Sequence, residues 1–300
     1  LIVLNNPNNP TGALMEALAL DAFVAIARSV DAYVLCDEVY RGTNQVGDGF
    51  APAMADVYEK GILAAMSLSL VGLGWHWKST RWFSLLVAGV CLFALWVYGT
   101  EIDKAETNFF LKFMLSSQSA IAWMGALYFM ATGAFLIGLL AQSDFGNKAG
   151  SGLTWAATVM GTVGLAVRWR ESYLIDFDFG HIPVSNLYEV FVLFCVITAL
   201  LYLYYENKFN NKDLGFFASI AISLSVAFVF WYSYSKGGHE IQPLVPALKS
   251  YWMKIHVPAN FVGYGAFSLS AMLGIAWLIK DSLTTRKLDA GADRLPSFQL

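Results

Sequence analysis

Four histidines are the residues in this chain best suited to binding a metal ion or a haem iron. His76 lies between two tryptophans, whereas His181, His239 and His256 lie in or beside two polar loops. Imidazole is a common metal ligand and the usual axial ligand of haem iron, because a ring nitrogen offers a lone pair at neutral pH. The two loops are therefore the first candidates for a cofactor site. For each histidine the alternative is an ordinary hydrogen-bonding residue.

A second group of polar residues lies near the start of the chain and follows short apolar runs. The run Leu1–Leu4 leads into a turn rich in asparagine and proline that contains Asn9, and the run Ala32–Cys36 leads into Asp37 and Tyr40. Two short strands separated by a helical pattern predict a βαβ unit, and α/β folds place ligand groups directly after the carboxyl ends of strands. This part of the chain is therefore a second candidate for a ligand site.

Composition predicts that most of the chain lies in a membrane. The chain is 57% hydrophobic and 14% charged, whereas soluble globular chains are about one quarter charged. A backbone inside lipid must satisfy its own hydrogen bonds, so apolar runs of ~20 residues are expected to be helices. The predicted fold class is mainly α: a polytopic α-helical membrane protein with about seven transmembrane helices over residues 56–300, preceded by a small α/β (βαβ) fragment over residues 1–55. The seven apolar runs are residues 61–77, 82–100, 113–143, 149–167, 190–205, 215–235 and 257–279.

The order of these runs places the histidine-containing loops on one side of the membrane. If each run crosses once and the tail after Lys280 is cytoplasmic, the loops 168–189 and 236–256 face outward. The expected location is a bacterial inner membrane, with both loops on the periplasmic side. The run 113–143 is longer than one span, so part of it is expected along the interface or in a loop. The net charge of −3 gives no reason to expect a nucleic-acid partner.

Side chains in both loops could surround a flat, apolar macrocycle. His256 follows the aromatic pair Tyr251 and Trp252, and Arg168 and Arg170 lie at the start of the other loop. Arginine forms strong hydrogen bonds with carboxylates, so these two could meet an anionic group such as a haem propionate. The alternative is that both arginines are ordinary anchors at the membrane interface.

The loop that contains His181 also predicts how the next helix begins. Ser185 is expected to cap a helix that starts near Asn186, because a serine hydroxyl accepts hydrogen bonds from the first N–H groups of a helix. Tyr188 is expected at the membrane interface, with its ring in an apolar layer and its hydroxyl in water. His181 itself is expected among the residues around the cofactor.

Two long segments carry a resemblance to a known family. Residues 181–189 read HIPVSNLYE and residues 240–265 read EIQPLVPALKSYWMKIHVPANFVGYG, and both resemble cytochrome c assembly proteins of the CcsA/ResC type. The resemblance covers roughly residues 55–300. It implies a subunit of a haem-delivery and cytochrome c synthetase complex rather than a stand-alone enzyme, working with a CcsB/ResB-type membrane subunit and presenting haem to apocytochrome c.

The same resemblance implies a role for one histidine. His256 would be the first of two external axial ligands of the haem iron. The family's tryptophan-rich haem-binding segment, its transmembrane histidine and its second external histidine are expected beyond residue 300. The chain is therefore expected to hold one half of the family's external haem site.

The first residues resemble a different family, the pyridoxal-phosphate-dependent aminotransferases of fold type I. The turn around Asn9 is similar to their Asn-Pro-Thr-Gly turn, and the segment from Asp37 to Tyr40 is similar to their Asp-x-x-Tyr segment. The resemblance implies that Asn9 and Tyr40 hydrogen-bond the phenolic oxygen of the cofactor and that Asp37 pairs with its pyridinium nitrogen. No segment of the Ser-x-Ser-Lys type follows within a few dozen residues, because an apolar run begins at Gly61 instead, so a vestigial pyridoxal phosphate site without aminotransferase activity is expected. The junction at residues 55–62 fits either family, which predicts a chimera.

Three hypotheses therefore follow from the sequence. The chain could be a membrane factor that handles haem, an aminotransferase represented by its first 60 residues, or a membrane protein without a cofactor, such as a permease scaffold. The first hypothesis is favoured, because it explains both the apolar runs and the two long matching segments.

Overall fold

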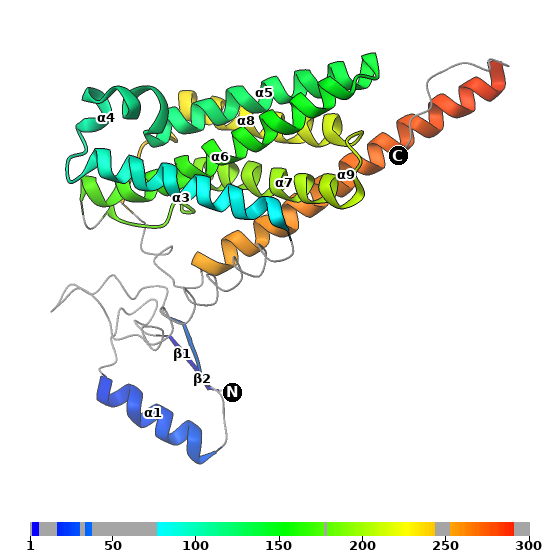
Figure 1. Ribbon diagram of the computed structural model, residues 1–300. Helices are drawn as coiled ribbons and strands as arrows, with labels where there is room; N and C mark the ends of the chain where they lie inside the picture. The colour runs from blue at the N-terminus through cyan, green and yellow to red at the C-terminus, as the bar shows by residue number, and fades with distance from the viewer. Residues whose placement is uncertain are drawn as a thin grey trace. The chain divides into compact units, whose positions relative to one another are not determined.

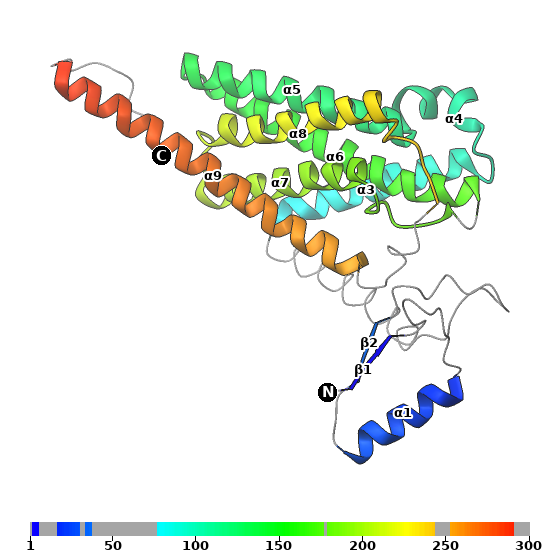
Figure 2. The ribbon, with the colours of Figure 1, turned by 180° about the vertical axis from the view of Figure 1, so that it is seen from behind.

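The computed structural model of the protein describes residues 2–5, 17–30, 34–37, 77–176, 179–243 and 253–290. The chain divides into two compact units. The first unit comprises residues 1–76 together with 243–256, and the second comprises residues 77–242 together with 257–300. Figures 1 and 2 show that the described part of the second unit is built of long helices.

In the first unit, two strands pair in parallel and a helix lies between them in the sequence. Strand β1 (Ile2–Asn5) pairs with strand β2 (Val34–Asp37), and helix α1 spans Ala17–Ser29. The register sets Asn5 opposite Asp37. The residues that connect these elements lie outside the described part of the chain, so the predicted α/β fragment stays a prediction.

Six helices are long and apolar enough to cross a membrane, which supports a multi-pass membrane protein with a mainly helical fold. The first predicted span, residues 61–77, lies outside the described residues except for Trp77, so the count of seven stays a prediction. A short helix α4 (Lys104–Thr107) and a π-helical turn η2 (Leu111–Leu115) lie between the first two of the six. The six are α3 (Lys78–Tyr98), α5 (Ser117–Ala141), α6 (Asp144–Ile175), α7 (Leu187–Phe209), α8 (Gly215–Lys236) and α9 (Met253–Ala290).

Local caps set the two ends of α5 within the longest apolar run, residues 113–143. Ser116 is the N-cap of α5, and its side chain accepts a hydrogen bond from the backbone N–H of Ser119. At the other end the backbone of Gln142 adopts a left-handed conformation with φ of 50°, which closes the helix. The residues before Ser116 form the π-helical turn η2, so part of the run 113–143 lies outside the span, as predicted.

Helix α6 packs against α3, α5 and α7 and depends on small residues to do so. A Cβ atom at Gly161 would lie only 2.6 Å from the sulfur of Met124 in α5 and 2.8 Å from a methyl group of Val196 in α7. Glycine therefore lets three helices approach closely, which is the usual basis of helix packing in membranes. The main apolar core forms where these helices meet α8.

The alternating helix directions gather five helix ends at one end of the second unit. The C-terminal ends of α3, α6 and α8 meet the N-terminal ends of α5 and α7 there, because hydrogen bonds join Tyr98 to Glu171 and Arg168 to Glu189 and to the segment after α8. We call this the polar end of the bundle. It carries most of the buried charged side chains of the described residues.

Candidate functional site

A buried ion pair between α6 and α7 lies at the polar end. Arg168 in α6 is 1% exposed and Glu189 in the first turn of α7 is 2% exposed. Arg168 Nε donates to Glu189 Oε1 at 2.7 Å, and the guanidinium carbon lies 5.3 Å from the centre of the Tyr188 ring. Removing one partner of such a pair leaves an uncompensated buried charge, so the two side chains depend on each other.

The same arginine holds the segment that follows α8. Its Nη1 donates to the carbonyl of His239 at 2.7 Å and its Nη2 donates to the carbonyl of Glu240 at 3.1 Å. The Nδ2 of Asn186 donates to the preceding carbonyl, that of Gly238, at 3.3 Å. Three consecutive carbonyl groups are thus fixed by side chains from α6 and from the start of α7. We call this arrangement the Arg168 clasp.

The start of α7 differs from the sequence prediction. Asn186, rather than Ser185, is the N-cap, and it forms a capping box with Glu189 in which each side chain accepts from the other residue's backbone N–H. The Ser185 hydroxyl instead donates to Glu189 Oε2 at 2.9 Å and lies 2.8 Å from His181 Nε2. Tyr188 lies in the first turn of α7 and is 4% exposed, because its ring packs against Arg168, and its predicted position at the membrane interface stays a prediction.

Two further residues predicted to surround a cofactor already have partners. His181 Nδ1 lies 2.7 Å from the carbonyl oxygen of Phe179 and its Nε2 lies 2.8 Å from the hydroxyl of Ser185, so both ring nitrogens are engaged. Arg170 Nη2 donates to the carbonyl of Gly99 at 2.9 Å and so ties α6 to the end of α3. Both side chains therefore hold the protein's own backbone or side chains in place.

A second buried carboxylate, which the sequence analysis missed, connects three helices. Glu171 in α6 is 6% exposed and accepts from the Tyr98 hydroxyl at 2.6 Å, from the Ser117 backbone N–H at 2.8 Å, and from the Ser117 hydroxyl. An anion is stabilised at a helix N-terminus by the free N–H groups and the helix dipole. Glu171 therefore caps α5 from a neighbouring helix. The sequence offered one indication of this residue: Glu171 follows Arg168 by three positions, which places both side chains on one face of a helix.

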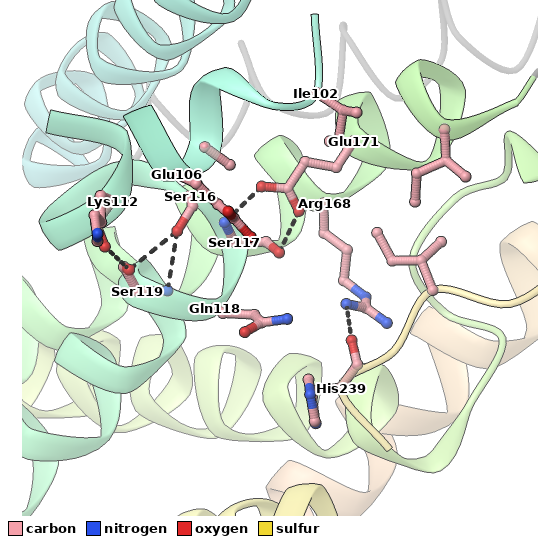
Figure 3. A pocket seen from close by; sticks show the side chains of 13 residues that line it. Ile102, Glu106, Lys112, Ser116, Ser117, Gln118, Ser119, Arg168, Glu171 and His239 are labelled. Atoms are coloured by element: carbon pink, nitrogen blue, oxygen red, sulfur yellow. Dashed lines mark hydrogen bonds between the residues drawn. The ribbon is translucent and has the colours of Figure 1, made fainter. Parts of the chain in front are cut away.

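A polar cavity of about 580 Å³ opens between these groups. Figure 3 shows Arg168, Glu171, Gln118 and His239 around one space, with the start of α5 on one side. His239 Nδ1 lies 3.0 Å from the Ser233 hydroxyl and 3.3 Å from the Ser233 carbonyl. The wall thus offers both donors and acceptors, which suits a polar ligand or ordered water. Among the described residues, no three His, Cys, Asp or Glu side chains are close enough together to hold a metal ion.

The remaining predicted site residues are placed only in part. His256 lies in the first turn of α9 with its side chain exposed, and it belongs to the first unit. Asp37 is the last residue of β2. Trp252, Asn9 and Tyr40 lie outside the described residues. The structure therefore leaves both the haem contacts at His256 and the pyridoxal phosphate contacts as predictions.

Comparison with known proteins separates the two parts of the chain. Residues 184–299 match the family model described as cytochrome c assembly protein, a range that begins before α7 and runs past the described end of α9. The membrane part of the chain is similar to the cytochrome c assembly proteins. Residues 1–69 give a short match to the model described as aminotransferase class I and II, which supports the second resemblance weakly.

Curated relatives point to the same assembly proteins. A protein of Chlorella vulgaris named cytochrome c biogenesis protein CcsA is 34% identical over 164 residues, which is 50% of this chain and 49% of the relative. Proteins of the same name from Gloeobacter violaceus and Marchantia polymorpha are each 30% identical and cover 51% and 58% of this chain and 41% and 48% of their own lengths. The chain thus spans about half the length of these relatives. No solved structure matches it.

Proposed function

We propose that this chain is a membrane component of cytochrome c biogenesis that handles haem at the outer face of a bacterial inner membrane. The observation that carries the proposal is the match of residues 184–299 to the cytochrome c assembly model, together with relatives named cytochrome c biogenesis protein CcsA. Haem is the cargo, and apocytochrome c is the acceptor to which it becomes covalently attached. A CcsB/ResB-type membrane subunit is the proposed partner.

His256 is the proposed axial ligand of the haem iron. It lies inside the matched segment, and its imidazole is exposed on the first turn of α9, so iron can be reached without opening the helical core. A neutral imidazole can coordinate iron through a ring nitrogen. Trp252 would supply an aromatic surface for the macrocycle.

The buried residues of the polar end would fix the helix ends and loops of the second unit. Arg168 is held by Glu189 and by two carbonyl groups, which favours a positioning role over a direct contact with a propionate. The segment that it holds, residues 238–240, precedes His256 in the chain. Arg170 and His181 would stabilise the neighbouring helix ends and the loop between α6 and α7 in the same way.

The test is haem content after expression in bacterial membranes, measured on the purified full chain by its pyridine haemochrome spectrum. His256→Ala is expected to lose bound haem, whereas the matched variant His76→Ala, which removes a histidine outside the two polar loops, is expected to keep it. Equal haem in His256→Ala and the wild type would contradict the ligand assignment. Labelling of a cysteine at position 256 only from the cytoplasmic side would contradict the outward orientation.

The short match of residues 1–69 favours a second candidate for the first unit, an aminotransferase fragment. We propose that Asn9, Asp37 and Tyr40 are vestigial pyridoxal phosphate contacts without activity, because no lysine of the Ser-x-Ser-Lys type follows within a few dozen residues of them. Addition of pyridoxal phosphate to the purified chain should give no absorbance band that borohydride reduces. Such a band would support a Schiff base and an active site.

A further inference from the structure

The segment between α3 and α5 must lie at one surface of the membrane. Helix α3 has 21 residues and α5 has 25, so each is about 30 Å or longer and can cross the hydrocarbon core. The connection between them contains α4 and η2 and lies where α5 begins, as Figures 1 and 2 show. We call residues 104–115 the elbow. Its side chains decide whether it lies in water or in lipid.

The elbow has one face that packs on the bundle and one that does not. Leu111 is fully buried and Leu115 nearly so, in the cluster formed by α3 and α6. Phe109, Phe113 and Met114 are exposed, with exposed fractions of 67%, 54% and 43%. The rings of Phe109 and Phe113 lie 5.2 Å apart and so form a continuous apolar surface. A surface of this kind on a short connector marks a contact with a membrane or another protein.

The depth of this surface is fixed by a tryptophan in α5. The Trp123 indole N–H donates to the carbonyl of Phe113 at 2.8 Å, so the two residues lie at the same level. Exposed tryptophans also lie near the same end in three other helices: Trp96 in α3, Trp169 in α6 and Trp231 in α8. Each lies within about 9 Å of its helix end, counted at 1.5 Å per residue. Tryptophan is enriched at the boundary between hydrocarbon and headgroups, so this ring indicates that boundary.

A groove with an apolar lining lies beside the elbow. It is a cavity of about 380 Å³ between α3 and η2, with Leu85, Leu86, Phe93 and Met114 among its lining residues. Gly89 also lines the groove and leaves space there, because it has no side chain and a Cβ atom at this position would meet no other atom within 4 Å. Charged residues lie along the same elbow, where the Lys112 ammonium group is 5.9 Å from the centre of the Phe113 ring. A lysine can keep its charge among headgroups while its stem covers apolar surface.

We infer that the elbow lies in the headgroup–acyl boundary of the bilayer, with Phe109 and Phe113 in lipid and an acyl chain in the groove beside η2. The tryptophans that mark the boundary lie on four different helices, which favours lipid around the bundle over one protein partner covering one side. This inference goes beyond the proposed function and does not depend on haem. In this arrangement the elbow is an anchor that fixes the position of the polar end relative to the membrane surface.

The test is the depth of a spin label in the full chain reconstituted into vesicles of phosphatidylcholine and phosphatidylglycerol. Cys36 and Cys91 are replaced by alanine, and the fully buried Cys195 is kept. Single cysteines are placed at Phe109 and Phe113, with Glu106 as the matched control on the charged side of the elbow. The label's relaxation is then compared in oxygen, which concentrates in lipid, and in a water-soluble nickel chelate.

Labels at positions 109 and 113 should respond more to oxygen than to the chelate, and the label at position 106 should show the reverse. A stronger response to the chelate at 109 and 113 would place the surface in water and overturn the inference. A weak response to both reagents at these positions would mean that protein covers the surface and would overturn it as well. Equal lipid exposure at positions 106 and 109 would show that the elbow has no separate lipid-facing side, and it would overturn the inference.

Discussion

Replacement of Arg168 by methionine should be the most destabilising single change at the polar end. Methionine is unbranched like the stem of arginine but has no charge, so the variant leaves Glu189 buried at 2% exposure without its cation. It also frees the two carbonyl groups of the Arg168 clasp. Breaking a buried ion pair from one side costs about 3–5 kcal/mol, and hydrogen bonds to a charged group contribute about 1.5–3 kcal/mol each. Because these terms overlap, we expect a loss of about 4 kcal/mol.

The assay is reversible unfolding of the purified chain in mixed micelles, followed by tryptophan fluorescence. The double variant with Glu189→Gln should regain part of the loss, because it removes the uncompensated charge; the coupling energy should be about 1–3 kcal/mol. Arg170→Met is the matched control, since the one hydrogen bond described for Arg170 goes to a carbonyl group, and should cost about 1 kcal/mol. If Arg168→Met costs no more than this control, or the two substitutions are additive, the ion pair does not carry the stability assigned to it.

Three further variants test the remaining features of the second unit. Glu171→Gln should cost about 1.5–3 kcal/mol in the same unfolding assay, because a buried charged acceptor is lost, whereas Glu106→Gln should have little effect; equal losses would contradict the capping role. Gly161→Val should cost at least about 1–3 kcal/mol through crowding between helices, while the same change at Gly152, which faces open space, should not. Burial raises the pKa of Asp213, a residue between α7 and α8, although a nearby lysine opposes the shift. The folded state therefore holds this proton more tightly, so the stabilisation is present below about pH 4 and is lost as pH rises through the raised pKa. Asp213→Asn should gain stability relative to the wild type between pH 4 and pH 7, and a constant difference would refute this.

Much of the fold can be predicted from the sequence, because a membrane imposes strong local rules. Long uncharged runs have to be helices, and six of the seven predicted runs correspond to described helices. Four of the six, those of α3, α5, α7 and α8, agree to within four residues at both ends. It was also predicted that part of the run 113–143 lies outside the span, since the run is too long for one crossing. Ser116 supplies the local cap at the start of α5. Two helix ends are less well predicted: α9 extends to Ala290, eleven residues beyond its apolar run, and α6 extends to Ile175, eight residues beyond its own.

The extension of α6 beyond its apolar run explains why the candidate site was predicted only in part. Arg168 was predicted at the start of a loop, because charged residues normally end a transmembrane pattern. Glu171 was not considered as a site residue. In the folded chain they remain helical and buried, since Glu189 neutralises the first and Tyr98 and Ser117 hydrogen-bond the second. These partners lie 21 to 73 residues away in the sequence. Residue spacing carries no information about such contacts.

The sequence by itself determined the membrane character, the helix positions and the similarity to cytochrome c assembly proteins. Each of these depends on local composition or on matching segments. Only the tertiary structure decided which polar residues are buried together. It moved the cap of α7 from Ser185 to Asn186, buried Tyr188 under Arg168, and gave both nitrogens of His181 a partner. The physical reason is that a charge survives in a low-dielectric interior only beside its partner, and helix packing brings the two together.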